Sequence, residues 1–237
     1  MTRQPILNIM TLRRMKTFAQ ASDQQLKAIL AAITLQRFER RTILFREGQP
    51  SDSLYILVSG VIKLSLKTPE DEDILVSLIA PGELFGITSL LPGMHRPFQS
   101  EAFSDCWIGR LPPDSLVSNM LGVAFSDFSA FMGGTVSRWF GLLYRYAHFQ
   151  GLNLQRRLAM ALLEIANKFG AQDDRGTLLI LQLTHDDLAD LVGASRQKVT
   201  EHLRELERQQ LIQRDGRKLI VSTERLQNIL QLDQLET

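Results

Sequence analysis

The polar side chains of residues 195–208 have types and a spacing that could recognise an ordered pattern of hydrogen-bond donors and acceptors. Val199, Leu203 and Leu206 recur at helical spacing and predict the buried side of a helix. The opposite side then carries Gln197, Glu201, Arg204 and Arg208, with Arg196 and Thr200 beside it. Arginine and glutamine can bond base edges in a DNA major groove through two atoms at once. The alternative is an ordinary helix with a solvated polar face.

The flanking segments favour DNA recognition over that alternative. Thr184 and Asp187 approximate a capping box, which predicts the start of a preceding helix. Gly193 can adopt the positive φ of a tight turn, and Ser195 is a suitable cap for the next helix. A hairpin turning on residues 215–216 follows. Two helices joined by a short turn, with a hairpin behind them, predict a winged helix-turn-helix.

The positions of the charged residues support DNA recognition, whereas the net charge does not. Residues 184–218 contain seven lysines and arginines and seven acidic residues, and the whole chain has a net charge of +1. Three of the acidic residues lie in the first helix, which has no lysine or arginine, whereas Arg214, Arg217 and Lys218 lie in the wing. The placement of the charges, and not the net charge, therefore supports a polyanion partner.

Composition places the chain among soluble globular proteins. Its 237 residues are 44% hydrophobic, with no apolar run long enough for a signal peptide or a membrane span. The one cysteine, Cys106, lies in an apolar run and is expected to be a buried, unreactive thiol. It excludes an intramolecular disulfide and, alone, an iron–sulfur cluster. We expect a cytoplasmic protein with no membrane partner.

The rest of the chain changes its sequence pattern twice, from helical to β-rich and back to helical. Residues 22–36 predict a short helix capped by Ser22. Short runs rich in β-formers then follow, at 42–45, 54–58, 61–66, 74–79 and 102–111. Such runs without intervening helices predict an antiparallel sandwich or barrel. Residues 114–169 are helical in pattern, and a broad apolar seam indicates packing on the β-domain and on a second copy of the chain. Its residues are Phe128, Met132, Thr135, Val136, Trp139, Leu143 and Tyr146.

This order of segments resembles the CRP/FNR family of bacterial transcription regulators. Residues 48–63, GQPSDSLYILVSGVIK, look like that family's cyclic-nucleotide-binding signature, and residues 81–86, PGELFG, resemble its approach to the effector site. Residues 183–221 are similar to its DNA reader. The resemblance implies an α+β protein with an N-terminal antiparallel β jelly roll, a long dimerisation helix and a C-terminal winged helix-turn-helix. The expected domains are 1–115, 116–150 and 151–237.

The resemblance also implies partners and contacts. It implies a homodimer on double-stranded DNA with a near-palindromic site, and it leaves RNA polymerase open as a further partner. The base-reading positions would be Arg196, Gln197 and Glu201, and the positions near phosphates Thr184, Ser195, Lys198 and Gly216. Thr200, Arg204 and Arg217 complete the candidate DNA-binding set. Glu201 could accept from cytosine N4 or pair with Arg204 or Arg208, and both readings stay open.

The candidate effector site departs from the family pattern. Relatives that bind cyclic AMP use a Gly-Glu pair and an Arg-Ser pair, whereas this chain has Gly86-Ile87 and Arg96-Pro97. The missing carboxylate and hydroxyl each remove hydrogen bonds worth about 1 kcal/mol, so the sequence argues against cyclic AMP. Arg96 remains a candidate anion anchor with Thr88 and Ser89 nearby, against the alternative of a surface arginine in the loop 92–97.

Three other functions are alternatives to an effector-controlled regulator. A haem-based gas sensor would take its axial ligand from Met94, His95, Met132 or His148. A constitutive DNA-binding regulator would use the β-roll only as a structural part. A cupin-type enzyme needs clustered histidines in the β-region, which holds only His95, so we expect no enzyme. The effector, the direction of regulation and the operator are left open.

Overall fold

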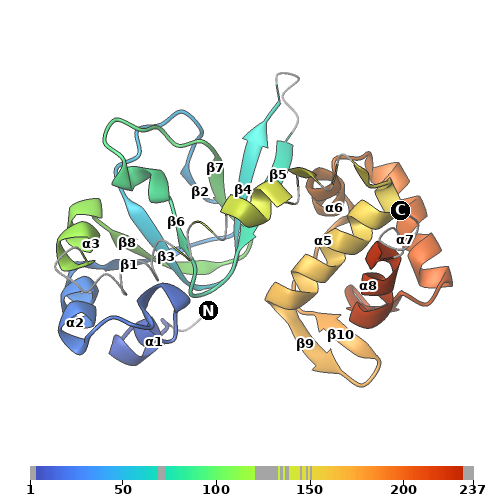
Figure 1. Ribbon diagram of the computed structural model, residues 1–237, viewed down its shortest axis with the longest axis horizontal. Helices are drawn as coiled ribbons and strands as arrows, with labels where there is room; N and C mark the ends of the chain where they lie inside the picture. The colour runs from blue at the N-terminus through green and yellow to red at the C-terminus, as the bar shows by residue number, and fades with distance from the viewer. Residues whose placement is uncertain are drawn as a thin grey trace. The chain divides into compact units, whose positions relative to one another are not determined.

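A computed structural model describes residues 4–68, 73–120, 133, 136, 139–144, 146–147, 149 and 151–231 of the chain. The chain divides into two compact units, Met1–Leu142 and Leu143–Thr237 (Figure 1). The three-part division expected from the sequence, with boundaries at residues 115 and 150, stays a prediction. In the described residues no helix is long and apolar enough to cross a membrane.

The first unit is built on two antiparallel four-stranded sheets. One has the strand order β1-β8-β3-β6 and the other β2-β7-β4-β5. Their bounds are β1 Thr34–Phe38, β2 Ile43–Phe45, β3 Leu54–Ser59, β4 Ile62–Lys67, β5 Asp73–Ile79, β6 Leu84–Phe85, β7 Gln99–Ala102 and β8 Cys106–Leu111. Every recorded pairing between these strands is antiparallel, which confirms the predicted β-roll.

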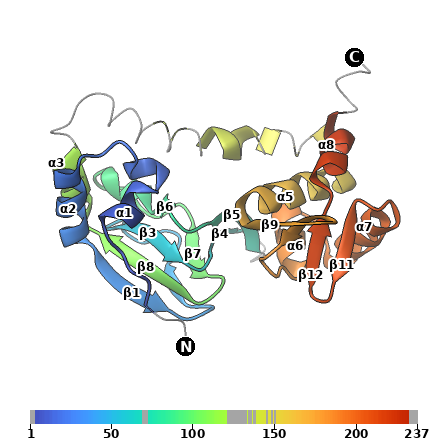
Figure 2. The same ribbon diagram turned by 90° about the horizontal axis from the view of Figure 1, so that it is seen from below.

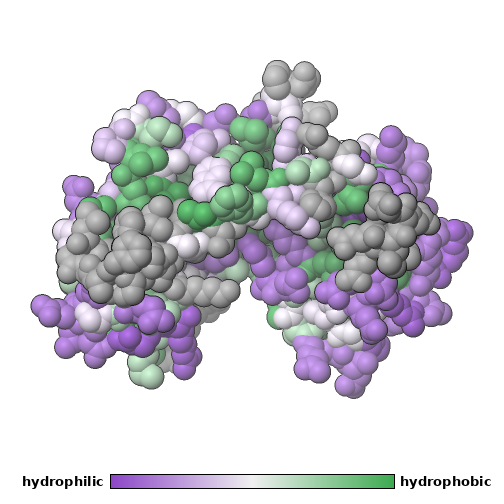
Figure 3. All heavy atoms as spheres, viewed as in Figure 1, coloured by the Kyte–Doolittle hydropathy of each residue, from purple (hydrophilic) through white to green (hydrophobic). Residues whose placement is uncertain are grey.

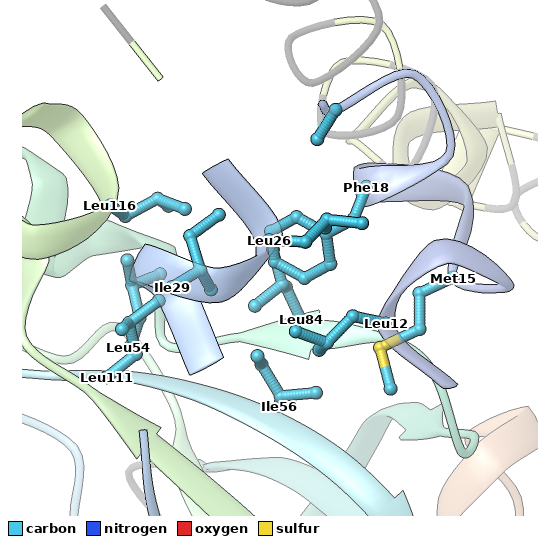
Figure 4. Close-up of a cluster of buried hydrophobic side chains, with 11 residues drawn as sticks. Leu12, Met15, Phe18, Leu26, Ile29, Leu54, Ile56, Leu84, Leu111 and Leu116 are labelled. Atoms are coloured by element: carbon cyan, nitrogen blue, oxygen red, sulfur yellow. The ribbon is translucent and has the colours of Figure 1, made fainter. Parts of the chain in front are cut away.

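Two apolar clusters hold this unit together. The inner cluster takes side chains from both sheets, among them Leu57, Ile62, Ala102 and Ile108, so it fills the space between them. The outer cluster lies where short helices cover the other face of the first sheet. In Figure 4, Leu12, Phe18, Leu26 and Ile29 converge on Leu54, Ile56, Leu84 and Leu111. The helical elements are α1 Ile9–Arg13, η1 Lys16–Phe18, α2 Asp23–Ala32, η2 Ile87–Leu90 and α3 Pro113–Met120.

The structure of the first unit differs from the sequence predictions at three places. The helix expected over 22–36 begins after its Ser22 cap but ends at Ala32, because residues 34–38 pair with β8 as strand β1. The run 102–111 is not one strand: β7 ends at Ala102 and β8 begins at Cys106. Strand β6 is two residues long, too short to leave a pattern of alternation in the sequence.

The expected dimerisation helix is described in part. Residues 133, 136, 139–144, 146–147, 149 and 151 are helical. In the single chain Val136, Trp139, Leu143 and Tyr146 are 40%, 43%, 60% and 67% exposed, and Phe140 is 66% exposed. The other seam residues, Phe128, Met132 and Thr135, lie outside the described residues. The large apolar side chains exposed along this helix are therefore compatible with a partner surface.

From residue 152 to residue 231 the second unit combines helices α5, α6, α7 and α8 with a small antiparallel sheet (Figure 2). Helix α5, Leu154–Phe169, buries one apolar side, including Leu158, Leu162 and Ile165. It is followed by β9 Gly170–Asp173, β10 Gly176–Leu179, α6 His185–Val192, α7 Arg196–Arg208, β11 Ile212–Asp215, β12 Lys218–Val221 and α8 Thr223–Gln231. The sheet order β11-β12-β10-β9 joins the predicted wing to a second hairpin that was not predicted.

Candidate nucleic-acid interface and effector pocket

The turn between α6 and α7 is fixed by its caps. Thr184 and Asp187 form the predicted capping box at the start of α6, each side chain bonding the other's backbone amide. Gly193 ends α6 with φ 61 and ψ 56, a left-handed conformation that strains a residue with a Cβ. The Ser195 hydroxyl then caps α7 by accepting from the Lys198 amide. The local sequence thus sets the angle at which α7 leaves the turn.

The inner side of α7 packs into the core of the DNA-binding head, the part of the second unit from α5 to α8. Val199, Leu203 and Leu206 are at most 1% exposed, as their spacing predicted. Leu188 and Val192 of α6 are equally buried. Because the apolar sides of both helices are buried in this core, the polar side of α7 faces outward. The side chains over α7, at the right of Figure 3, are drawn in hydrophilic colours.

The outward side of α7 carries a hydrogen-bonded pair. Gln197 Nε2 donates to Glu201 Oε1 across one helical turn, at 3.1 Å. Arg208 pairs with Glu205 instead of Glu201. In the described part of the chain no ion pair joins Arg204 to Glu201. Of the two alternatives for Glu201, pairing with Arg204 or Arg208 is not seen in the single chain, where Gln197 donates to Glu201 and Arg208 pairs with Glu205.

Arg196, the first residue of α7, reaches back to α6. Its Nη1 lies 3.4 Å from Asp186 Oδ2, and both side chains are more than 60% exposed. Exposed pairs of this kind contribute about 0–1 kcal/mol, so a stronger acceptor can displace Asp186. The guanidinium is therefore held near the surface of the head and remains available to another partner.

His185 joins the two helices beneath this surface. Its Nδ1 lies 2.7 Å from Thr200 Oγ1, and Thr200 also donates to the Arg196 carbonyl oxygen. Burial, followed by the charges of Arg214 and Arg196, lowers the pKa of His185. The neutral imidazole therefore fixes Thr200, which was predicted only as a member of the DNA-binding set.

The wing is tied to its surroundings by two ion pairs. Arg214 Nε lies 3.3 Å from Glu207 of α7. Arg175, in the turn between β9 and β10, contacts Asp173 and Asp215, each at 2.9 Å. Those hydrogen bonds lower the pKa of Asp173 to about 2. The role of Arg175 was missed, since its hairpin lies about forty residues before the wing in sequence.

The predicted phosphate-contact residues lie around the same surface. Lys198 and Arg217 are exposed, and Gly216 forms the wing turn. The Thr184 hydroxyl donates to Asp187 at 2.6 Å, so its hydrogen is already used within the cap. The head thus brings together α7, the start of α6 and the wing, whereas contacts of individual residues with DNA stay predictions.

The candidate effector residues gather at one end of the β-roll. Gly86 begins η2 with a left-handed φ of 73, followed by Ile87, Thr88 and Ser89. Thr88 Oγ1 lies 2.8 Å from Ser51 Oγ, and the buried Ser89 hydroxyl has no hydrogen-bond partner among the described residues. Pro97 is exposed. The segment is therefore a compact turn held against the loop that precedes β3.

Arg96 is the centre of this end of the roll. Its side chain is 1% exposed, so the alternative of a surface arginine is wrong. Nη1 donates to the Gly86 carbonyl oxygen at 2.9 Å and Nη2 to the Ser53 carbonyl oxygen at 2.8 Å. Asp52 lies 3.5 Å from Nη2, and burial lowers the guanidinium pKa. The guanidinium is thus bonded within the chain, although Nε has no partner among the described residues.

Aromatic rings complete the surroundings of Arg96. Its guanidinium carbon lies 4.3 Å from the Phe45 ring centroid and 5.5 Å from that of Tyr55, within cation–π range. Tyr55 also lines a cavity of about 120 Å3, together with Gln36, Phe38, Leu44, Ile108 and Arg110. The roll therefore has room for a small group beside this cluster, but the arginine itself is already surrounded.

Other sensing chemistries have little support in the described residues. Cys106 is buried, and burial raises the pKa of its thiol to about 12. This fits the expected unreactive thiol. Met94 and His95 lie on an exposed loop, whereas Met132 and His148 lie outside the described residues. The described part of the chain contains no group of three His, Cys, Asp or Glu residues placed to hold a metal ion.

Comparison with known proteins matches both units. Residues 35–120 match the model of a cyclic nucleotide-binding domain, and residues 156–229 match that of a Crp-like helix-turn-helix domain. The transcriptional regulator SdrP of Thermus thermophilus is 30% identical over 72% of this chain and 84% of its own length. The chain belongs to the CRP/FNR family. It is a CRP/FNR-type transcriptional regulator with a helix-turn-helix DNA-binding domain.

Further relatives of this CRP/FNR chain agree in fold. A CRP-like cAMP-activated global transcriptional regulator of Mycobacterium tuberculosis is 27% identical, covering 83% of this chain and 90% of the relative. The structure of FixK2 from Bradyrhizobium japonicum matches with a TM-score of 0.72 at 18% identity, covering 83% of this chain and 96% of that one. The expectation of a regulator instead of an enzyme is confirmed by these relatives.

Proposed function

We propose that this CRP/FNR protein is a homodimeric, sequence-specific DNA-binding regulator whose α7 enters the major groove of a near-palindromic site. The observation that carries the proposal is the two-sided character of α7. Val199, Leu203 and Leu206 are buried, while the polar side chains on the opposite side are exposed on a helix whose start is fixed by Ser195. A rigid helix with an outward polar side is what groove recognition requires.

The proposed contacts fall into two classes. Arg196, Gln197 and Glu201 read base edges, with Thr200 and Arg204 beside them. Thr184, Ser195, Lys198, Gly216 and Arg217 lie near phosphates, where they set the register of the head. The first class gives specificity, and the second gives affinity that falls with salt.

Dimerisation is proposed along the helix that contains Trp139 and Leu143. Both side chains are exposed in the single chain, at 43% and 60%. Two heads on one dimer would bind two half-sites about 34 Å apart, or a multiple of that spacing. Linking the heads raises the apparent affinity far above that of one head. The dimer is proposed to act on transcription together with RNA polymerase.

The experiment combines selection of bound duplexes from random DNA with the mass of the protein in solution by light scattering. We expect a two-fold symmetric consensus and a dimer mass. Leu143→Glu places a charge in the seam and should give a monomer with strongly reduced binding to the full site. Ile180→Glu is the matched control, because Ile180 is also exposed, at 58%, but lies in the head. Absence of any consensus, or a monomeric wild type that binds as tightly, contradicts the proposal.

For the β-roll we propose that cyclic AMP is not the effector. Ile87 stands where relatives have a carboxylate, and Arg96 already donates to Gly86 and Ser53. A phosphate could accept from Nη1 and Nη2 of Arg96 only if these bonds were broken in a buried site. This observation also favours the second candidate function, a constitutive regulator whose β-roll is structural.

Measuring the affinity for DNA while ligands are titrated distinguishes a regulator with an effector from a constitutive regulator. If the roll is structural, neither cyclic AMP nor a cell extract depleted of protein changes the affinity for the selected duplex. An increase in affinity with extract but not with cyclic AMP supports a different effector. An increase with cyclic AMP at micromolar concentration contradicts the proposal.

A further inference from the structure

The hydrogen bond between Gln197 and Glu201 gives the outward side of α7 a specific chemical character. The two residues are one helical turn apart, so they lie side by side on the helix surface. Gln197 Nε2 donates to Glu201 Oε1 at 3.1 Å, and both side chains are exposed. The bond uses an amide hydrogen of Gln197 and orients the rest of the amide group.

Two neighbouring cations are paired with other carboxylates. Arg196 pairs with Asp186 and Arg208 with Glu205. Among the described residues the Glu201 carboxylate receives a hydrogen bond from Gln197 alone. Its Oε2 is therefore left to accept a hydrogen bond from a partner outside the chain. Gln197 Oε1 is a second acceptor of the same pair.

Acceptors discriminate sharply among base edges in a major groove. Cytosine N4 and adenine N6 present amino groups there, whereas guanine O6 and N7 and thymine O4 are themselves acceptors. A carboxylate facing guanine or thymine would meet lone pairs in a field already made negative by phosphates. It would face an amino group without this penalty and gain a charge-assisted hydrogen bond.

We propose that Gln197 and Glu201 act as one acceptor unit that accepts from the amino group of cytosine N4 or adenine N6 at one base pair of each half-site, and so fixes which strand carries that base. The guanidinium of Arg196 makes a neighbouring contact to a guanine. This inference rests on the proposed function, since it requires α7 to enter the major groove. It differs from independent reading by two side chains, because the bond between them fixes which atoms of Gln197 face outward.

The test uses the full-length protein and a duplex obtained by selection from random DNA. Each base pair of the selected half-site offers one amino group in the major groove, from adenine or cytosine, and each pair under α7 is tested in turn. Replacing cytosine by 2-pyrimidinone, or adenine by purine, removes only the amino group and should weaken wild-type binding about 5- to 100-fold. For Glu201→Gln, whose amide both donates and accepts, the loss caused by the analogue should shrink to less than about threefold.

A matched control removes the same charge elsewhere. Glu224 lies at an exposed position in the first turn of α8, in the same head, and Glu224→Gln removes one negative charge there. It should keep the wild-type preference and the wild-type sensitivity to the base analogue. Gln197→Ala should lower the preference in wild type but have little further effect in the Glu201→Gln background, because the two residues act together.

The outcomes separate this inference from the proposed function. Because every base pair contains one adenine or one cytosine, the base analogues decide the outcome. The inference is overturned if removing the amino group at no pair under α7 weakens wild-type binding, or if Glu201→Gln is as sensitive to the analogue as the wild type. If Arg196→Ala abolishes specific binding in that case, the proposed function stands without the acceptor unit. If the wild type has no sequence preference at all, the proposed function itself fails.

Discussion

Arg96 donates from Nη1 to the carbonyl oxygen of Gly86 at 2.9 Å, inside the β-roll. This bond joins the two sequence pairs, Gly86-Ile87 and Arg96-Pro97, that we expected from the family resemblance to form the effector site. The same guanidinium donates to Ser53 and lies over the Phe45 ring. An arginine expected to be exposed or to bind an anion is thus part of the interior of this unit.

Gly86→Ala should destabilise the β-roll. The residue has φ 73, and a Cβ there would lie 2.7 Å from Arg96 Nη1 and 3.0 Å from Tyr55 Cδ2. Gly93→Ala is a matched control, because φ is 74 but nothing lies within 4 Å of the added atom. We expect Gly86→Ala to lose about 1–3 kcal/mol of unfolding free energy and Gly93→Ala clearly less. Urea unfolding followed by Trp107 fluorescence measures both, and equal losses would contradict a role for the Arg96 contact.

Arg96→Met and Arg96→Lys should both lower the stability of the first unit. Methionine leaves the carbonyl oxygens of Gly86 and Ser53 without donors, at a cost of about 1–3 kcal/mol each, offset in part by removal of a buried charge. Lysine keeps the charge, but its single nitrogen does not reproduce the planar fork. We expect a net loss of about 2 kcal/mol in both variants. A Lys variant as stable as wild type would show that only the charge matters.

Asp186→Asn should strengthen binding to DNA of any sequence. The change releases Arg196 from its ion pair and removes a negative charge from the surface proposed to face phosphates. The pair is exposed, so the gain should be about two- to fivefold at low salt and should vanish at high salt. Fluorescence anisotropy with a random duplex at several salt concentrations measures it. Asp174→Asn, in the exposed β9–β10 turn, is the control, and an equal gain there would refute the specific role of Asp186.

His185 should make the head less stable in acid. Burial and the nearby Arg214 and Arg196 lower its pKa, so the unfolded chain binds a proton more readily than the folded one. Its contribution is complete above pH 6.5, the ordinary histidine pKa, and decreases as the pH falls below that value. Amide hydrogen-exchange protection of α7 should fall between pH 7.5 and about 5.5, and fall less in His185→Gln. If His202→Gln flattens the profile equally, the effect does not come from His185.

The sequence predicted the DNA-binding head well because its signals are local. The Thr184 cap, the Gly193 turn and the spacing of Val199, Leu203 and Leu206 each act within a few residues. The second hairpin β9–β10 escaped prediction, since its four-residue strands are stabilised by pairing with β12, a segment distant in sequence. Strand β1 was missed for the same reason, because β8 lies about seventy residues away.

The site chemistry was predicted only in outline. The residue types on α7 identified the surface, but which donor each carboxylate takes depends on competition among neighbours. Glu201 accepts a hydrogen bond from Gln197, and Arg208 forms an ion pair with Glu205. The burial of Arg96 depends on two loops, which are joined by backbone bonds such as that from the Arg96 amide to Gln49. Such distant pairings leave no periodic pattern in the sequence.

The central claim, that the outward side of α7 reads DNA sequence, is tested most directly by the affinity of Arg196→Ala for two duplexes. One is the duplex selected by the wild type, and the other has the same composition in scrambled order. A bidentate contact to guanine carries about 1–3 kcal/mol of discrimination. We predict that the variant loses 5- to 100-fold on the selected duplex and about threefold or less on the scrambled one. Equal losses on both duplexes, or no loss on either, would contradict the account.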